Sequence, residues 1–105
     1  MKLKHIKQDE FNQEVLNSTT PVVVDFYADW CGPCQMLGPV LEEIAEEHQN
    51  IKIVKVNVDD AQELCREYGI FSIPHVIVFK DGKKIDNFVG FQSKEKVLDV
   101  LKKYM

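Results

Sequence analysis

Cys31 and Cys34, which are separated by two residues, are the side chains of this sequence best suited to covalent chemistry. Two intervening residues let the thiols close into a disulfide, and one helical turn would bring both sulfurs to the same end of a helix. The sequence contains only three cysteines, so a close pair is more typical of a catalytic or metal-binding site than of a disulfide framework. The spacing therefore predicts a dithiol that exchanges with other disulfides.

Gly32 and Pro33, the two residues between the cysteines, are expected to tune the reactivity of the pair. If Cys31 is an N-cap, these residues and Cys34 fill the first helical turn, where a proline is tolerated because first-turn N–H groups lack an intrahelical partner. Pro33 has no N–H group, so we infer that the amide of Cys34 is the donor nearest the Cys31 sulfur. That amide and the positive end of the helix favour the Cys31 thiolate, which lowers its pKa.

The predicted reaction has two displacements. The Cys31 thiolate attacks a substrate disulfide and forms a mixed disulfide, and Cys34 then attacks Cys31 and releases the reduced substrate. Cys34 should lie deeper and be less ionised, so a nearby base would assist it. Asp25 is the candidate proton acceptor, because it interrupts an apolar strand in which burial should raise its pKa. The alternative is a structural aspartate bonded to the backbone or to Lys55.

Strand and helix patterns alternate around this segment. Strands are expected at 3–6, 22–27, 51–58, 76–79 and 84–89. Helices are expected at 9–17 with Asp9 as N-cap, at 34–48, at 61–68 before Gly69, and from a Ser93 cap to Tyr104. Asp81-Gly82 is typical of a hairpin turn. The order, βαβαβ then αββα, predicts an α/β fold with a mixed central sheet and helices on both faces.

Composition limits the classes of protein to which the chain could belong. A length of 105 residues predicts one domain over 1–105. The net charge of −4 argues against a nucleic-acid partner. No apolar stretch reaches the length of a membrane span, and residues 1–10 lack the pattern of a signal peptide. These features predict a cytoplasmic protein without membrane contact.

A wider set of residues resembles the thioredoxin family over essentially the whole chain. The matching segments are Asp-Phe-Tyr-Ala-Asp-Trp-Cys-Gly-Pro-Cys at 25–34, Pro39, 55–59, 68–70, 72–74, 79–82 and Gly90. The resemblance implies the thioredoxin fold and a general protein-disulfide reductase without a bound cofactor. It also implies electrons from NADPH through a thioredoxin reductase, disulfide-containing protein substrates and a monomer.

The resemblance further implies a substrate-binding surface beside the cysteines. The Ile73–Pro74 bond would be cis, and the backbone of Ile73 would pair with an extended substrate. Trp30, Pro74 and Gly90 would border this surface.

Several residues have two interpretations. His75 and Phe91 depart from the family pattern: His75 would either sense the charge of the dithiol or simply pack and form a hydrogen bond, and Phe91 would enlarge the apolar surface. Cys65 would be either a regulatory or dimerising thiol or a half-buried apolar residue. His5 and His48 carry no motif and are expected at the surface.

Other functions compete with a reductase. A zinc module would need a second ligand pair, for which only Cys65 and scattered histidines remain, so no metal is expected. A disulfide isomerase or oxidase would use the same dithiol in the other direction, but Gly32-Pro33 favours reduction. A redox-competent scaffold subunit is the third alternative.

Overall fold

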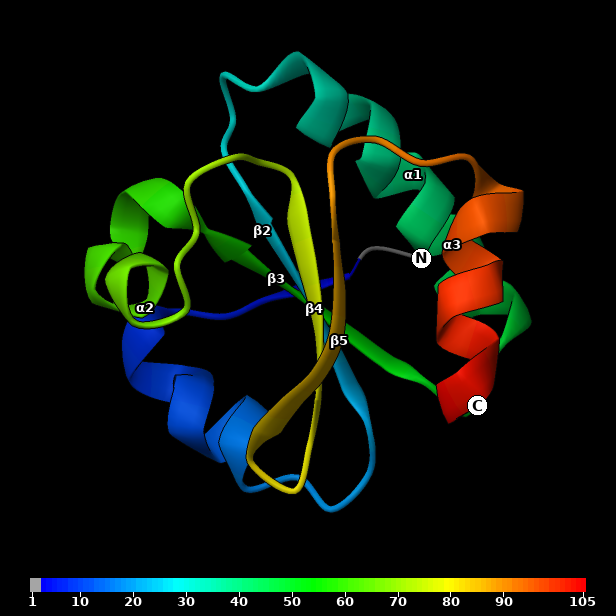
Figure 1. Cartoon of the computed structure of the whole chain (residues 1–105), viewed down its shortest axis with the longest axis horizontal. Helices are drawn as coiled ribbons and strands as arrows, with labels where there is room; N and C mark the ends of the chain where they lie inside the picture. The colour runs from blue at the N-terminus through cyan, green and yellow to red at the C-terminus, as the bar shows by residue number, and fades with distance from the viewer. Residues whose placement is uncertain (1–2) are drawn as a thin grey trace.

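A five-stranded mixed sheet forms the centre of the protein, shown in Figure 1. The computed structural model describes residues 3–105. The strands are β1 (Lys4–His5), β2 (Val22–Tyr27), β3 (Lys52–Asn57), β4 (His75–Lys80) and β5 (Lys83–Val89). Their order is β1-β3-β2-β4-β5, in which β1, β3 and β2 are parallel and β4 and β5 are antiparallel to their neighbours. The predicted mixed sheet is confirmed.

Helices cover both faces of this sheet, as expected. Helices α1 (Gly32–Glu47) and α3 (Lys94–Leu101) lie on one face, and α2 (Gln62–Glu67) lies on the other with the N-terminal helical segment (Figure 1). Short 3₁₀ helices span Gln8–Glu10, Val58–Asp60 and Lys102–Tyr104. None of the helices in residues 3–105 has the length and apolar character needed to cross a membrane.

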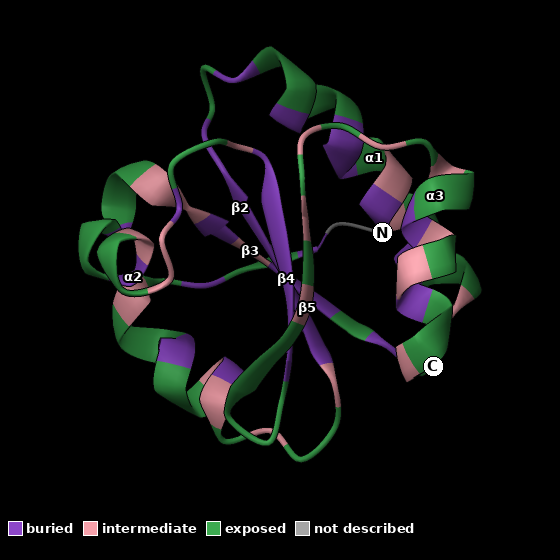
Figure 2. Cartoon of the chain, in the orientation of Figure 1, coloured by how far each residue is buried: buried purple, intermediate pink, exposed green. Residues whose placement is uncertain are grey.

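Successive side chains of β2 point to opposite faces of the sheet and so contribute to two apolar layers. Val22, Val24 and Phe26 point toward the side of α2, whereas Val23 points toward α1 and α3. All six residues of β2 are buried, which Figure 2 shows as a purple central strand. A strand covered on both faces explains the nearly continuous apolar run in the sequence.

The first helical segment differs from the prediction. Asp9 is not an N-cap: it lies inside the 3₁₀ helix, which is followed by a single turn of π-helix over Asn12–Leu16. The carboxylate of Glu10 accepts a hydrogen bond of 2.8 Å from the backbone N–H of Lys7. The side chain that caps the start of the segment is therefore that of Glu10. Burial of Phe11 and Val15 then anchors the segment to the sheet.

The other turns follow their residue types. Asp81 and Gly82 both have positive φ angles, 53° and 78°, as a primed hairpin turn requires. The side chain of Ser93 accepts a hydrogen bond from the N–H of Lys96 at the start of α3. Beyond Leu101 the chain continues to Tyr104 as a 3₁₀ helix, a shorter α-helix than the sequence predicts.

The loops that carry the candidate site residues lie at one edge of the sheet. Phe26 near the end of β2 pairs with His75 at the start of β4, and His75 pairs with Val89 at the end of β5. The loop before β4, the loop after β2 and the loop after β5 therefore leave the sheet at the same edge, at the top of Figure 1.

Candidate active site

Cys31 is the N-cap of α1. Its backbone is extended, with φ −94° and ψ 111°, and its Sγ accepts a hydrogen bond of 3.2 Å from the N–H of Cys34. Pro33 lies in the first turn, where it displaces no helical hydrogen bond. The helix therefore aims its positive end and the expected amide at the Cys31 sulfur.

Cys31 and Cys34 form a disulfide, with their Cα atoms 5.2 Å apart. Both residues are buried, and Cys34 lies deeper, with 2% of its surface exposed against 6% for Cys31. They pack with Tyr27 and Ala28 in a small apolar cluster of their own. Cys31 is therefore the more exposed of the two cysteines.

The loop before β4 faces the cysteines. The Ile73–Pro74 peptide bond is cis, and the carbonyl oxygen of Ile73 lies 3.8 Å from the Sγ of Cys31. Gly90, with φ 87°, donates its N–H to the carbonyl oxygen of Pro74 at 2.7 Å. The loop before β4 thus connects the cysteine pair to the end of β5.

Trp30 stands beside Cys31 with 71% of its surface exposed. Its indole Nε1–H donates a hydrogen bond of 3.0 Å to the carboxylate of Asp59, which fixes the ring against the loop after β3. Ile73 lies beside the Cys31 sulfur, Gly90 is hydrogen-bonded to Pro74, and Trp30 precedes Cys31 in the chain. Their contact with substrate stays a prediction.

Asp25 is fully buried in the middle of β2. Its side chain lies on the α1 face of the sheet, because it alternates with Val24 and Phe26 on the opposite face. Neither carboxyl oxygen has a hydrogen-bond partner among residues 3–105. Burial raises the pKa of Asp25 to about 6, although the nearby positive charge of Lys55 opposes the shift. The alternative of a structural aspartate hydrogen-bonded to the backbone or to Lys55 is not what the described residues show.

Lys55 lies next to Asp25 across the β2–β3 pair. A β-carbon built on Gly38 would lie 3.5 Å from the Lys55 Nζ, so the ammonium fits beneath α1 where a side chain is missing. Cys34 and Gly38 are four residues apart and share one face of α1. The register and the helix face together bring Asp25, Lys55 and Cys34 to the same region.

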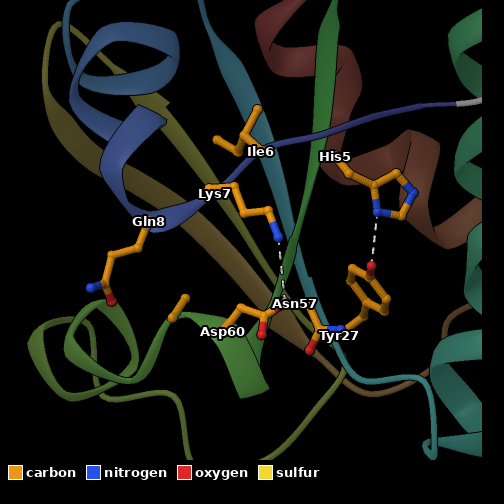
Figure 3. A pocket seen from close by; sticks show the side chains of 8 residues that line it. His5, Ile6, Lys7, Gln8, Tyr27, Asn57 and Asp60 are labelled. Carbon is orange, nitrogen blue, oxygen red and sulfur yellow. Dashed lines mark hydrogen bonds and ion pairs between the residues drawn. The ribbon is translucent and has the colours of Figure 1, made fainter.

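A cavity of about 250 Å³ is lined in part by Cys34. His5, Tyr27 and Lys55 contribute to its lining. A second, smaller cavity of about 100 Å³ is also lined by His5 and Tyr27 and is shown in Figure 3. Nδ1 of His5 and the hydroxyl of Tyr27 are 2.8 Å apart and line both cavities. The sequence gives no signal for this pair, because it depends on the pairing of β1 with β3.

The structure gives the surroundings of the remaining candidates, and their roles stay predictions. His75 is buried, and its Nε2 lies 3.1 Å from Oδ1 of Asn87, while burial lowers its pKa. Cys65 is half-buried against the apolar layer beneath α2, and burial raises the pKa of its thiol. Phe91 is 40% exposed beside Gly90. Residues 3–105 contain no group of three His, Cys, Asp or Glu side chains placed to hold a metal.

Comparison with known proteins agrees with this geometry. The family model described as Thioredoxin matches residues 2–103. The chain belongs to the thioredoxin family. A thioredoxin of Pyropia yezoensis is 45% identical over 100% of this chain and 99% of its own length. Thioredoxin 1 of Synechococcus elongatus is 47% identical over 90% of each chain. A thioredoxin of Mycoplasmoides gallisepticum is 47% identical over 95% of this chain and 100% of its own.

Thioredoxin membership and the Cys31–Cys34 disulfide together define the activity. The chain is a thiol–disulfide oxidoreductase that reduces disulfides of proteins. The family requires no bound cofactor, because the cysteine pair itself carries the two electrons.

Proposed function

We propose that reduction proceeds with Cys31 as the attacking thiolate and Cys34 as the resolving thiol. In the first step a substrate S–S bond breaks, a Cys31–substrate disulfide forms and one substrate thiolate leaves. In the second step Cys34 displaces the other substrate thiolate and the Cys31–Cys34 disulfide closes. The observation that carries this assignment is the 3.2 Å hydrogen bond from the Cys34 amide to the Cys31 sulfur at the start of α1.

Asp25 is the proton acceptor for Cys34 in this proposal. Resolution requires the Cys34 thiol to lose a proton in a buried region. A carboxylate with a pKa of about 6 accepts that proton well near neutral pH, because a base works best when its pKa lies near the working pH. The position of Asp25 on the α1 face supports the role.

Trp30, Ile73, Pro74 and Gly90 form the substrate-binding surface in this proposal. The carbonyl of Ile73 lies beside the Cys31 sulfur, where an extended peptide could pair with the backbone. Backbone pairing is indifferent to substrate side chains, which suits a reductase of many proteins. Gly32 and Pro33 keep the first turn of α1 free of polar side chains and so favour the reducing direction.

The wider cycle is also part of the proposal. Residues 1–105 act as one domain and as a monomer in the cytoplasm, and a thioredoxin reductase returns electrons from NADPH to the cysteine pair. The match over 99% of the Pyropia yezoensis thioredoxin supports the single domain. A compartment that keeps thiols reduced is the one in which the oxidised Cys31–Cys34 pair can be returned to its dithiol form.

The reduction potential of the Cys31–Cys34 pair tests the direction of the reaction. Equilibration with defined ratios of reduced and oxidised glutathione, followed by acid trapping, measures it directly. We expect a potential more reducing than that of the glutathione pool. A more oxidising value would instead support the disulfide isomerase or oxidase.

A further inference from the structure

Exposed apolar side chains are concentrated around the cysteines. Within residues 3–105 the large apolar side chains with the greatest exposure are Trp30, Met36, Phe71, Ile85, Val89 and Phe91. Four of these six, Trp30, Phe71, Val89 and Phe91, lie within two residues of Cys31, Ile73 or Gly90 in the sequence, whereas Met36 and Ile85 are each five residues away. Single exposed apolar residues are ordinary, but a group of them marks an interaction surface.

Phe71 is the most exposed of these residues, with 93% of its surface open to solvent. Its neighbour Ile70 is buried at 9% and holds the loop to the apolar layer beneath α2. The edge of the Phe71 ring lies 3.7 Å from a β-carbon built on Gly69, so the ring lies over a residue that has no side chain. The fold therefore presents this aromatic ring at the surface rather than in the core.

The position of Phe71 relative to the sulfur is limited by the length of the backbone. Two peptide units separate Phe71 from Ile73, so their Cα atoms are no more than about 7.6 Å apart. The carbonyl of Ile73 is 3.8 Å from the Sγ of Cys31. An extended substrate paired with Ile73 spans about 3.3 Å per residue. Its side chains within about two residues of the attacked cysteine are thus within reach of the Phe71 ring.

Phe91 is connected to the same loop through its neighbour Gly90. It follows Gly90, whose N–H is bonded to the carbonyl of Pro74. Phe71 thus adjoins Ile73 and Pro74 along the chain, and Phe91 adjoins them through this hydrogen bond. We propose that Phe71, with Phe91, selects substrate polypeptides in which large apolar side chains flank the disulfide-bonded cysteine. This inference rests on the proposed binding at Ile73, and it adds a side-chain preference to a backbone contact that has none.

Two symmetrical peptide disulfides provide the test. One joins two copies of Gly-Leu-Cys-Leu-Gly and the other joins two copies of Gly-Ser-Cys-Ser-Gly, so that both sulfurs of each disulfide are equivalent. The reduced protein gives two electrons and two protons, the peptide disulfide becomes two peptide thiols, and the Cys31–Cys34 disulfide closes. Acid-quenched single turnovers measure the rate with each peptide. Reaction with dithiothreitol corrects for any difference in intrinsic reactivity.

The measured quantity is the ratio of the leucine rate to the serine rate. We expect a corrected ratio of about fivefold for the unaltered protein, which corresponds to partial burial of one leucine side chain. In Phe71→Ser the ratio should fall to about one, and in Phe71→Leu most of the preference should return. Ile85→Ser is the matched control, because Ile85 is exposed near the start of β5, at the end of the strand opposite Gly90, and its ratio should be unchanged.

Three results would overturn the proposal. These are a ratio of about one in the unaltered protein, an undiminished ratio in Phe71→Ser, or an equal loss in Ile85→Ser. Concentration-dependent sedimentation that Phe71→Ser abolishes would show that a second copy of this chain occupies the surface, which also overturns it. Failure to reduce either peptide would contradict the proposed function itself and is thus distinguishable.

Discussion

The ammonium of Lys55 lies 4.2 Å from the centre of the Tyr27 ring. This cation–π contact holds the charge on the α1 face of the sheet, near Asp25 but without a hydrogen bond to its carboxyl oxygens. Lys55 therefore acts on Asp25 through space and only partly offsets the cost of burial. The result is a carboxyl group whose pKa of about 6 allows it to exchange a proton near neutral pH.

Replacing Lys55 should raise the pKa of Asp25 further. Lys55→Met removes the positive charge that lowers the pKa and leaves burial, which raises it. The pKa in the oxidised protein should therefore move above about 6. Carbon-13 chemical shifts of the Asp25 carboxyl group across pH measure the change. Lys52→Met is the control, because Lys52 lies in the same strand but pairs with Glu14 at the surface. An equal shift in both variants would contradict a specific effect of Lys55.

Replacing Asp25 by asparagine should stabilise the oxidised protein at neutral pH. The pKa of Asp25 is raised from 3.8 to about 6 in the folded state, so the folded protein holds this proton more tightly than the unfolded chain. The contribution of Asp25 to stability therefore falls as pH rises from about 4 to about 6 and stays low above that range. A difference of about 2 pKa units corresponds to roughly 3 kcal/mol. The cost of burying an unpaired amide reduces the expected gain to about 1–3 kcal/mol.

Urea unfolding at two pH values separates this effect from a general one. Asp25→Asn should exceed the unaltered protein in free energy of unfolding at pH 7.5, where the carboxyl group is charged. The advantage should disappear at pH 4, where the carboxyl group is already neutral in the folded state. An equal advantage at both pH values would mean that charge burial is not the cause.

Local patterns predict most of the fold because they act over few residues. The apolar run of β2, the Asp81-Gly82 turn and the Ser93 cap each depend on neighbours in the sequence, and the structure confirms all three. The N-cap position of Cys31 is confirmed for the same reason. Asp9 fails as a cap because Glu10 supplies the hydrogen bond, and residue type alone does not decide between two nearby carboxylates.

Long-range packing places the features that the sequence leaves open. His5 meets Tyr27 only because β1 pairs with β3, and two residues of strand carry too weak a pattern to fix that register. Ile70 and Phe71 are both apolar neighbours, yet one is buried and the other is 93% exposed. Nothing local separates them, because the difference arises from how the loop after α2 turns toward the cysteines.

The rate of resolution should depend on Asp25. In the unaltered protein the rate at which Cys34 releases substrate from the mixed disulfide should rise with pH through about 6, where Asp25 loses its proton. Asp25→Asn should remove this inflection and slow resolution at pH 7 by about 100-fold, the lower end of the usual contribution of a general base. Single-turnover release of a peptide thiol across pH measures both effects. An unchanged rate and profile would leave Asp25 as a structural residue only.

Serine substitutions should separate the roles of the two cysteines. Cys34→Ser keeps the attacking sulfur at the start of α1 but cannot close the Cys31–Cys34 bond, so it should accumulate a covalent complex with a protein substrate such as insulin. Cys31→Ser should form no such complex and should lose reduction altogether.

The matched control for this pair is Cys65→Ser, which removes the third thiol, a half-buried residue of α2. It should reduce insulin at the rate of the unaltered protein and accumulate no covalent complex with it. Non-reducing electrophoresis followed by mass spectrometry identifies which sulfur carries the substrate. A stable complex on Cys34 in the Cys31→Ser variant would reverse the assignment, because the buried cysteine would then be the one that substrate disulfides reach first.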